Sequence, residues 1–258
     1  MFGLFKKKEQ KKEITFNYSS IAVDMHSHVL PGIDDGAQNP QESVFLIRKM
    51  MELGIRKIIA TPHIMADYYK NNAETIGNAL AVLKEELKKE NIDIEVEAAA
   101  EHYFDELFEK RIEEDTLMVM GSNYVLFELS FISRPQNLVA IIQKMLDKGY
   151  RPILAHPERY TYMNLEQLRS LREMGCLMQL NTISLTGYYG AHIKKSAESY
   201  VDAQIVDFIS SDMHHPRHAE ALENALSTDY LEKILKHSYP LMNIMLLKKA
   251  AAGTVNSK

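Results

Sequence analysis

The sequence predicts an α/β fold of parallel strands joined by helical crossovers, and three observations predict it. Seven short apolar runs alternate with amphipathic stretches along the chain. Helix-length segments between successive runs are what parallel strand pairs require. No internal repeat, low-complexity tract or Gly/Ser linker interrupts the alternation. Seven such units in 258 residues favour a closed (β/α) barrel in a single domain, with a doubly wound open sheet as the alternative.

The apolar runs have the length and composition of buried strands. We expect strands at 21–25, 57–61, 92–99, 124–129, 152–155, 177–180 and 205–210. Between the first two, Val44, Ile47 and Met51 recur at helical spacing, and Gly54 then ends the stretch. We expect helices at 41–53, 75–89, 138–148, 165–174, 191–202, 219–226 and 230–237.

The N-terminal residues differ in character from the rest of the chain. Residues 1–19 are predicted to form a flexible basic tail, and residues 20–258 the folded domain. Phe2, Leu4 and Phe5 precede five lysines, a pattern that suits either a solvated tail or weak contact with an anionic membrane surface. The segment lacks the apolar region and cleavage site of a secretory signal.

Composition narrows the class of protein. A formal net charge of −5 argues against nucleic acid as the main partner. The single cysteine, Cys176, excludes an internal disulfide framework and fits a reducing compartment. No apolar run approaches the ~20 residues that span a bilayer. The prediction is a cytoplasmic protein.

Polar residues follow the apolar runs, which is where parallel α/β folds carry their chemistry. Eight of the ten histidines lie at predicted strand ends or a few residues beyond, whereas His192 and His237 lie on predicted helices. The eight are His26, His28, His63, His102, His156, His214, His215 and His218. Glu101, Glu158 and Asp212 share these positions.

This pattern predicts a metal site. Residues two apart on an extended strand point to the same side, so His26 and His28 can bind one ion together. Imidazole and carboxylate ligands without a thiolate suit manganese, iron or zinc. The eight candidate ligands are His26, His28, Asp35, His63, Glu101, His156, Asp212 and His214. That number favours two or three ions over one.

Each candidate also has a purely structural interpretation. A lone histidine at a strand end is commonly a hydrogen-bonded structural residue. Asp34 and Asp35 before Gly36 could form only a turn, and Asp212 could cap a helix. The metal prediction is preferred because five strand ends would otherwise need five separate explanations.

A multinuclear site of this kind is suited to hydrolysis of phosphate esters by a metal-bound hydroxide. Arg159 and Arg217, each three residues beyond a candidate histidine, are the candidates for binding the phosphate. A cysteine-dependent phosphatase would need an arginine six positions after the nucleophile, but Thr182 stands there after Cys176. The glycine motifs of nucleotide binding and the serine-hydrolase elbow are absent.

Five segments together resemble a known superfamily. They are "DMHSHVLPGIDDGA", "ATPH", "AEHYFDE", "LAHPERY" and "SDMH". In this order they are similar to the polymerase-and-histidinol-phosphatase (PHP) superfamily, and more narrowly to the manganese-dependent protein-tyrosine phosphatases of bacterial capsule and exopolysaccharide operons. The resemblance covers the chain from about Ile21 to the last helix and leaves out the basic tail.

The resemblance implies a distorted seven-stranded (β/α) barrel of the PHP type with a trinuclear manganese site. By motif, His26, His28, Glu101 and Asp212 would hold one ion. Glu101 would bridge to a second ion held by His63 and His156, while Asp35 and His214 would help to hold a third. Arg159 would contact the substrate phosphate, and Arg217 matches only if the loop after "SDMH" is short. The resemblance assigns no metal role to His102.

The implied substrate is the phosphotyrosine-bearing tail of a membrane-anchored bacterial tyrosine autokinase. Tyrosines just after strand ends could line an aromatic pocket or simply pack, and they are Tyr68, Tyr69, Tyr103, Tyr160 and Tyr162. The alternative enzyme is a small-molecule phosphatase such as histidinol-phosphate phosphatase. A DNA-processing exonuclease fits the acidic balance less well, and a non-catalytic regulatory module fits the full ligand set less well.

Overall fold

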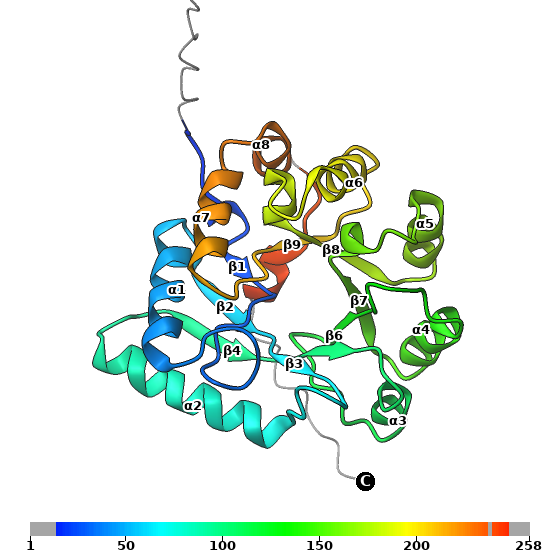
Figure 1. Ribbon diagram of the computed structural model, residues 1–258, viewed down its shortest axis with the longest axis horizontal. Coiled ribbons are helices and arrows are strands. Elements are labelled where there is room, and N and C mark those ends of the chain that lie inside the picture. Colours follow the sequence, from blue (N-terminus) through cyan, green and yellow to red (C-terminus); the bar gives the residue numbers. More distant parts are fainter. Residues whose placement is uncertain (1–13, 237–238, 248–258) are drawn as a thin grey trace, which may run out of the picture.

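A computed structural model describes residues 14–236 and 239–247, in which the strands are parallel and the helices surround them (Figure 1). One sheet has three strands in the order β1–β2–β4, and the other has six in the order β3–β5–β6–β7–β8–β9. The strands of the first sheet are β1 (Val23–Asp24), β2 (Lys57–Ala60) and β4 (Glu95–Ala98). Those of the second are β3 (His63–Ile64), β5 (Glu101–Tyr103), β6 (Tyr124–Glu128), β7 (Arg151–Ala155), β8 (Leu177–Asn181) and β9 (Phe208–Ser210).

The helices follow the predicted alternation, with one addition. They are α1 (Pro40–Glu52), α2 (Ala73–Lys89), α3 (Phe108–Glu113), α4 (Leu138–Asp147), α5 (Leu165–Glu173), α6 (Ala191–Asp202), α7 (Pro216–Ala225) and α8 (Asp229–Lys236). Short 3₁₀ turns are η1 (Tyr18–Ser20), η2 (Pro157–Arg159), η3 (Thr182–Thr186) and η4 (Asn243–Leu247). Asn39, Asn72 and Asn164 cap α1, α2 and α5 through their side chains. The six-residue helix α3 was not predicted.

The predicted closed barrel is not confirmed, because the described residues contain no closed sheet. Two short strands, β3 and β5, lie just beyond the ends of the second and third predicted strands, 57–61 and 92–99. Pro62 follows β2 and has no amide hydrogen to donate, so the ladder is interrupted before His63 begins β3. At the far edges, β1 and β9 do not pair with each other, and beyond their ends an isolated bridge joins Ser27 and Met213.

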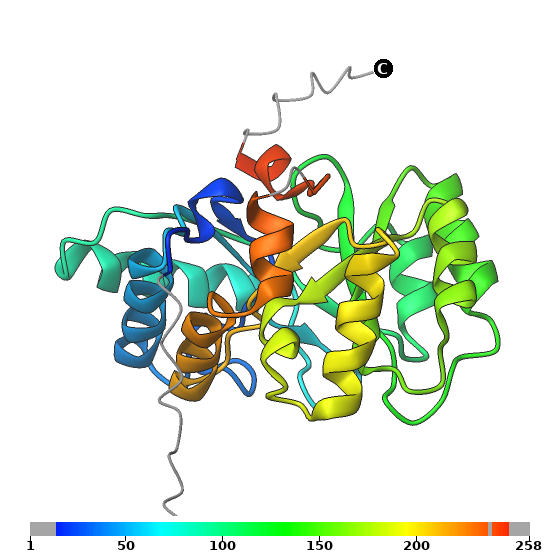
Figure 2. The ribbon, with the colours of Figure 1, turned by 90° about the horizontal axis from the view of Figure 1, so that it is seen from above.

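A buried side chain occupies the space between β1 and β9. The Asn243 amide donates to Val23 O at 3.0 Å and to Ile209 O at 2.7 Å, and its oxygen accepts from Ile209 N at 3.1 Å. These contacts replace part of the strand ladder that a closed barrel would have. Figure 2 shows η4, which carries Asn243, at one end of the strands.

The alternation of side chains along the strands divides the core in two. On β6, Val125 and Phe127 face the larger apolar cluster beneath the helices. Tyr124 and Leu126 face a smaller cluster between the strands, which Leu246 of η4 closes. The smaller cluster lies beneath the strand ends that carry the polar residues.

The predicted tail, residues 1–19, falls largely outside the described residues. Near its end Tyr18 is buried, and its hydroxyl donates to Leu222 O of α7 at 2.8 Å. The packed domain therefore includes residues just before position 20. No described helix is both long and apolar enough to cross a bilayer.

Candidate metal centre

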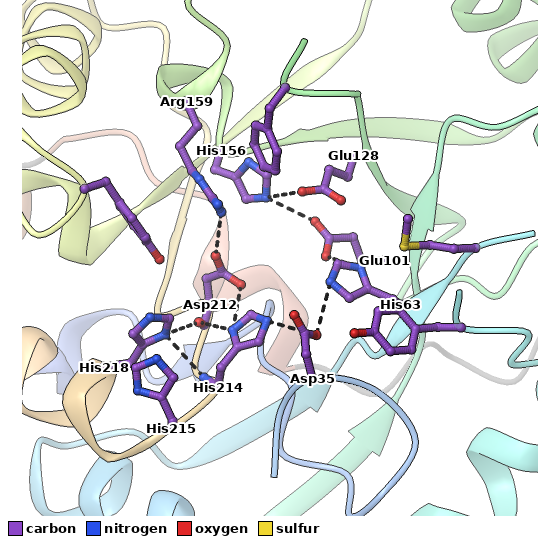
Figure 3. Close-up of a pocket in the computed structure, with 14 residues that line it drawn as sticks. Asp35, His63, Glu101, Glu128, His156, Arg159, Asp212, His214, His215 and His218 are labelled. Atoms are coloured by element: carbon purple, nitrogen blue, oxygen red, sulfur yellow. Dashed lines mark hydrogen bonds and ion pairs between the residues drawn. The ribbon is translucent and has the colours of Figure 1, made fainter. Parts of the chain in front are cut away.

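The predicted ligands meet at the carboxyl ends of the strands, around a cavity of about 370 Å³ (Figure 3). Six of the eight line it, and His26 and His28 lie beneath with no exposed surface. The six are Asp35, His63, Glu101, His156, Asp212 and His214. His63 and Glu101 belong to β3 and β5, while His156 and Asp212 follow β7 and β9.

His26 and His28 point the same ring nitrogen into the site. His28 Nδ1 donates to Asp34 Oδ2 at 2.7 Å, and His26 Nδ1 lies 3.0 Å from Gln179 Oε1. Both outer partners are oxygen acceptors, so each ring carries a proton on Nδ1 and, when it is neutral, a lone pair on Nε2. The two Nε2 atoms nevertheless face each other at 3.3 Å.

Two carboxylate oxygens join these nitrogens. Glu101 Oε2 and Asp212 Oδ1 each lie 3.3 Å from His26 Nε2 and 3.4 Å from His28 Nε2. Four acceptors that face one another in a buried site repel unless a proton or a cation lies among them. The donor set, two imidazoles and two carboxylates, therefore fits a divalent cation such as manganese, iron or zinc.

Glu101 also faces a second group of ligands. Its Oε1 lies 3.2 Å from His156 Nε2 but meets no partner in hydrogen-bonding geometry. His63 Nδ1 lies 3.1 Å from Glu101 Oε2, and Glu128 Oε1 lies 3.4 Å from His156 Nε2. One carboxylate thus borders both groups, which is the arrangement of a bridging ligand.

A third group lies toward solvent. Asp35 Oδ1 is 3.6 Å from Nε2 of both His63 and His214. Ligand atoms of Asp35, His28, His63 and His214 all lie within 4.8 Å of one another. The Asp35 side chain is 52% exposed, so this group borders the open side of the cavity.

Unusual backbone geometry places several of these side chains. His156 and Asp212 have left-handed φ values of 30° and 52°, a conformation that costs on the order of 1–3 kcal/mol outside glycine. Gly36 packs directly on His28, where an added Cβ would lie 1.9 Å from the His28 carbonyl oxygen. Only glycine lets this loop approach closely enough to bring Asp34 and Asp35 to the site.

The electrostatics of the site favour added positive charge. Burial disfavours a charged His28, but Asp34, Asp212 and Glu101 outweigh it and hold the pKa of His28 well above its usual value. Burial together with the Glu101 carboxylate raises the pKa of Glu128 well above its usual value. Both directions reflect an excess of buried carboxylates, which a bound cation would relieve.

Arg159 is held at the mouth of the cavity. Its guanidinium lies 4.4 Å from the ring centre of Phe131 and 4.6 Å from that of Tyr189. One nitrogen also donates to Asp212 Oδ2 at 3.3 Å. Two aromatic faces and a carboxylate thus fix the guanidinium beside the candidate ligands. Figure 3 shows Arg159 next to Asp212 and His156.

The cavity is not lined by three other residues of the sequence analysis, Arg217, Cys176 and His102. Arg217 is exposed in the first turn of α7 and is not among the residues that line the cavity, so the structure does not bring it to the site. His218, one residue on, lines the cavity instead. Cys176 is buried, and burial raises the pKa of its thiol, which disfavours a nucleophilic role. His102 is buried, and its Nε2 accepts from Met118 N at 3.1 Å.

The tyrosines that follow predicted strand ends lie in different places. Tyr69 lines the cavity and stacks on His63, whereas Tyr68 and Tyr103 line a neighbouring groove. Tyr160 is buried and accepts from Leu129 N, so it packs rather than presents a surface.

Sequence reasoning missed three residues that shape the site. Glu128 is the penultimate residue of an apolar run, where it resembles an ordinary strand residue. Its position at the carboxyl end of β6 is the signal that could have identified it. Asp34, shortly before Gly36, has the sequence context of a turn residue, and Gln179 lies within a predicted strand. These last two orient His28 and His26.

Comparison with known proteins gives a consistent family. Residues 22–249 match the family model described as "Capsular polysaccharide synthesis, CpsB/CapC". The tyrosine-protein phosphatase YwqE of Bacillus subtilis is 33% identical over 196 residues, covering 75% of this chain and 77% of YwqE. The putative tyrosine-protein phosphatase CapC of Staphylococcus aureus is 31% identical, covering 74% of this chain and 76% of CapC.

Solved structures agree with these relatives. A crystal structure from work on YwqE of Bacillus subtilis and CpsB of Streptococcus pneumoniae, described as unique metal-dependent tyrosine phosphatases, superposes with a TM-score of 0.73. It is 29% identical, and the match covers 86% of this chain and 90% of that one. A phosphotriesterase homology protein from Escherichia coli, 13% identical with a TM-score of 0.51 over 91% of this chain and 96% of that one, shares the fold alone.

Proposed function

The chain belongs to the CpsB/CapC family of capsular polysaccharide synthesis, and from this we propose that it is a metal-dependent phosphatase acting on phosphotyrosine in proteins. One observation carries the proposal. Two buried imidazole nitrogens lie 3.3 Å apart, and each lies within 3.4 Å of one Glu101 oxygen and one Asp212 oxygen, beneath a cavity that Arg159 borders. A proton or a cation among them is needed to make that arrangement stable, and an anionic substrate is what the arginine would bind.

The ligand groups suggest how two or three cations would be held. His26, His28, Glu101 and Asp212 would hold the first, His63, His156, Glu101 and Glu128 the second, and Asp35 and His214 would contribute to a third. Bound cations of this kind supply an activated water and neutralise phosphoryl oxygens. Manganese is the proposed metal, with iron or zinc as alternatives.

The chain's own residues would bind and orient the substrate. Arg159 donates one bond to Asp212, which leaves further N–H groups of its guanidinium to bind phosphoryl oxygens. Phe131 is 43% exposed, and together with Tyr69 it gives the cavity an aromatic wall for a tyrosine ring. No step needs the buried Cys176.

Further parts of the proposal concern the substrate protein, the place in the cell where the enzyme acts, and the fold. We infer that the substrate is the phosphorylated tail of a membrane-anchored bacterial tyrosine kinase, and that the enzyme acts in the cytoplasm. The basic N-terminal residues would then contact the inner face of the membrane weakly. The strands form seven runs that neighbour one another in chain order, with β2 and β3 in one run and β4 and β5 in another. Together the two sheets would form a distorted barrel that is open beside β1.

The decisive experiment assays purified protein on a phosphotyrosyl peptide and on histidinol phosphate. We expect chelation to abolish hydrolysis of the peptide, manganese to restore it, and His63→Ala to remove it. His192→Ala changes an exposed histidine on α6 and serves as the matched control. Turnover of histidinol phosphate alone would show a small-molecule phosphatase. An unchanged rate in His63→Ala would contradict metal catalysis at this site.

A further inference from the structure

A second hollow adjoins the metal cavity, and nothing in the proposed reaction uses it. This groove, of about 510 Å³, shares Met65 with the metal cavity. Its walls are the loop after β3, the loop after β5 and the segment before α4. A protein chain that places one side chain in the metal cavity would therefore lie over this groove with its neighbouring residues.

The groove is built from fixed loops. Met65 N donates to Tyr69 O at 2.8 Å, which closes the first loop on itself. The Asp105 carboxylate accepts from Ala66 N at 2.8 Å and from Leu107 N at 3.0 Å, and so ties the two loops together. Arg111 neutralises that carboxylate at 3.0 Å. The surface is already formed without a ligand.

The chemistry of the groove is aromatic with an acidic rim. Tyr68, Tyr103 and Phe104 line it, and the Tyr68 side chain is 78% exposed. Asp67 and Glu106 are both exposed and, within the described part of the chain, neither side chain has an ion-pair or hydrogen-bond partner. The lining contains no lysine or arginine. Such a surface complements lysine or arginine, whose stems pack on rings while their charged ends reach carboxylates.

We propose that this groove binds basic residues that flank the phosphotyrosine of the substrate protein. The inference rests on the proposed function and adds a sequence preference to it. The metal cavity attracts the anionic phosphate, whereas the groove beside it attracts cations, so the pair selects a segment of mixed charge. Neutral or acidic flanking residues would gain nothing from Asp67 and Glu106.

The test compares two phosphotyrosyl peptides that differ only in flanking residues, lysine in one and glutamate in the other, together with phenyl phosphate. We expect the wild-type kcat/KM to be about fivefold to tenfold higher for the lysine peptide at low salt, through KM, and the preference to shrink at high salt because the charges are exposed. Asp67→Asn with Glu106→Gln should reduce the preference to within about twofold. Phenyl phosphate turnover should not change, because that molecule does not reach the groove.

A matched control carries the same change of charge elsewhere. Glu85 and Asp93 are exposed and lie away from both hollows' linings, so Glu85→Gln with Asp93→Asn should retain the full preference. Equal turnover of the two peptides by the wild type, or a preference that survives Asp67→Asn with Glu106→Gln, would overturn the groove proposal alone. Turnover of phenyl phosphate without either peptide would overturn the proposed function and this inference with it.

Discussion

Two buried polar clusters lie between β1 and β9, at opposite ends of the strands, and they differ in kind. At the amino ends, Asn243 meets two carbonyl oxygens with its amide hydrogens and one amide hydrogen with its oxygen. At the carboxyl ends, His26, His28, Glu101 and Asp212 present acceptors to acceptors. The first cluster is complete within the chain, whereas the second needs an added proton or cation. Burial of polar groups therefore identifies a site only where donors and acceptors fail to match.

The largest expected effect tests the incomplete cluster. Glu101→Gln removes the carboxylate that borders both ligand groups, so we expect kcat/KM on a phosphotyrosyl peptide to fall by about a thousandfold or more, roughly 4 kcal/mol. Manganese should raise the Tm of this variant much less than that of the wild type, because the carboxylate that borders both ligand groups is gone. Thermal unfolding with and without manganese measures this difference. A variant that manganese stabilises as much as the wild type would remove the distinction between the clusters.

The second effect tests the complete cluster. Asn243→Leu leaves the Ile209 amide hydrogen and two carbonyl groups without partners, so we expect a loss of about 3 kcal/mol in the free energy of unfolding. Denaturant titration measures this loss. The kcat/KM of the folded fraction should stay within about twofold of the wild type. Lost activity with unchanged stability would place Asn243 in the function of the molecule instead.

Substitution of Arg159, which lies at the carboxyl ends of the strands, should have a smaller effect on activity. Arg159→Lys keeps the charge but loses the planar fork between Phe131 and Tyr189. We expect kcat/KM to fall about tenfold to thirtyfold, because a lysine cannot bind phosphate through two parallel bonds. Steady-state kinetics with a phosphotyrosyl peptide measure this loss. The matched control is Arg217→Lys, which should retain nearly full activity. Equal losses in both variants would contradict the placement of Arg217 outside the site.

Phe131 should act through Arg159 and the substrate ring. Phe131→Leu removes one of the two aromatic faces against the guanidinium, so we expect KM to rise about threefold to tenfold with kcat less affected. Phe131→Tyr, which keeps the ring, should restore most of the affinity. If both variants raise KM equally, the ring itself is not what positions the arginine.

Cys176 should have the smallest effect on activity. Cys176→Ser places a hydroxyl in an apolar environment and should cost about 1–2 kcal/mol of stability. The turnover number of the folded enzyme should remain within about twofold of the wild type. A large loss of turnover at equal folding would indicate thiol chemistry.

The sequence located the carboxyl-end residues well because strand ends can be recognised locally. An apolar run, its end and the polar residue that follows lie within a few positions of each other, as in "ATPH" around His63. The structure brings all eight candidate ligands together for that reason.

What the sequence could not show depends on distant contacts. The sheets are unclosed at two places: the break between β2 and β3, where Pro62 lies, and the space beside β1 that Asn243 fills. Gln179 and Asp34 act through the histidines that they orient, and the local sequence at neither position indicates this role. Arg217 shared its spacing with Arg159, but the first turn of α7 carries its side chain outward.

The stacking of Phe131 on both Arg159 and His156 offers a spectroscopic window on this protein. The chain contains no tryptophan, so Phe131→Trp would introduce a single indole fluorophore in contact with the Arg159 guanidinium and the His156 imidazole. Its emission would report metal loading and substrate arrival in real time, without a label. Stopped-flow traces could then separate the order of those two events.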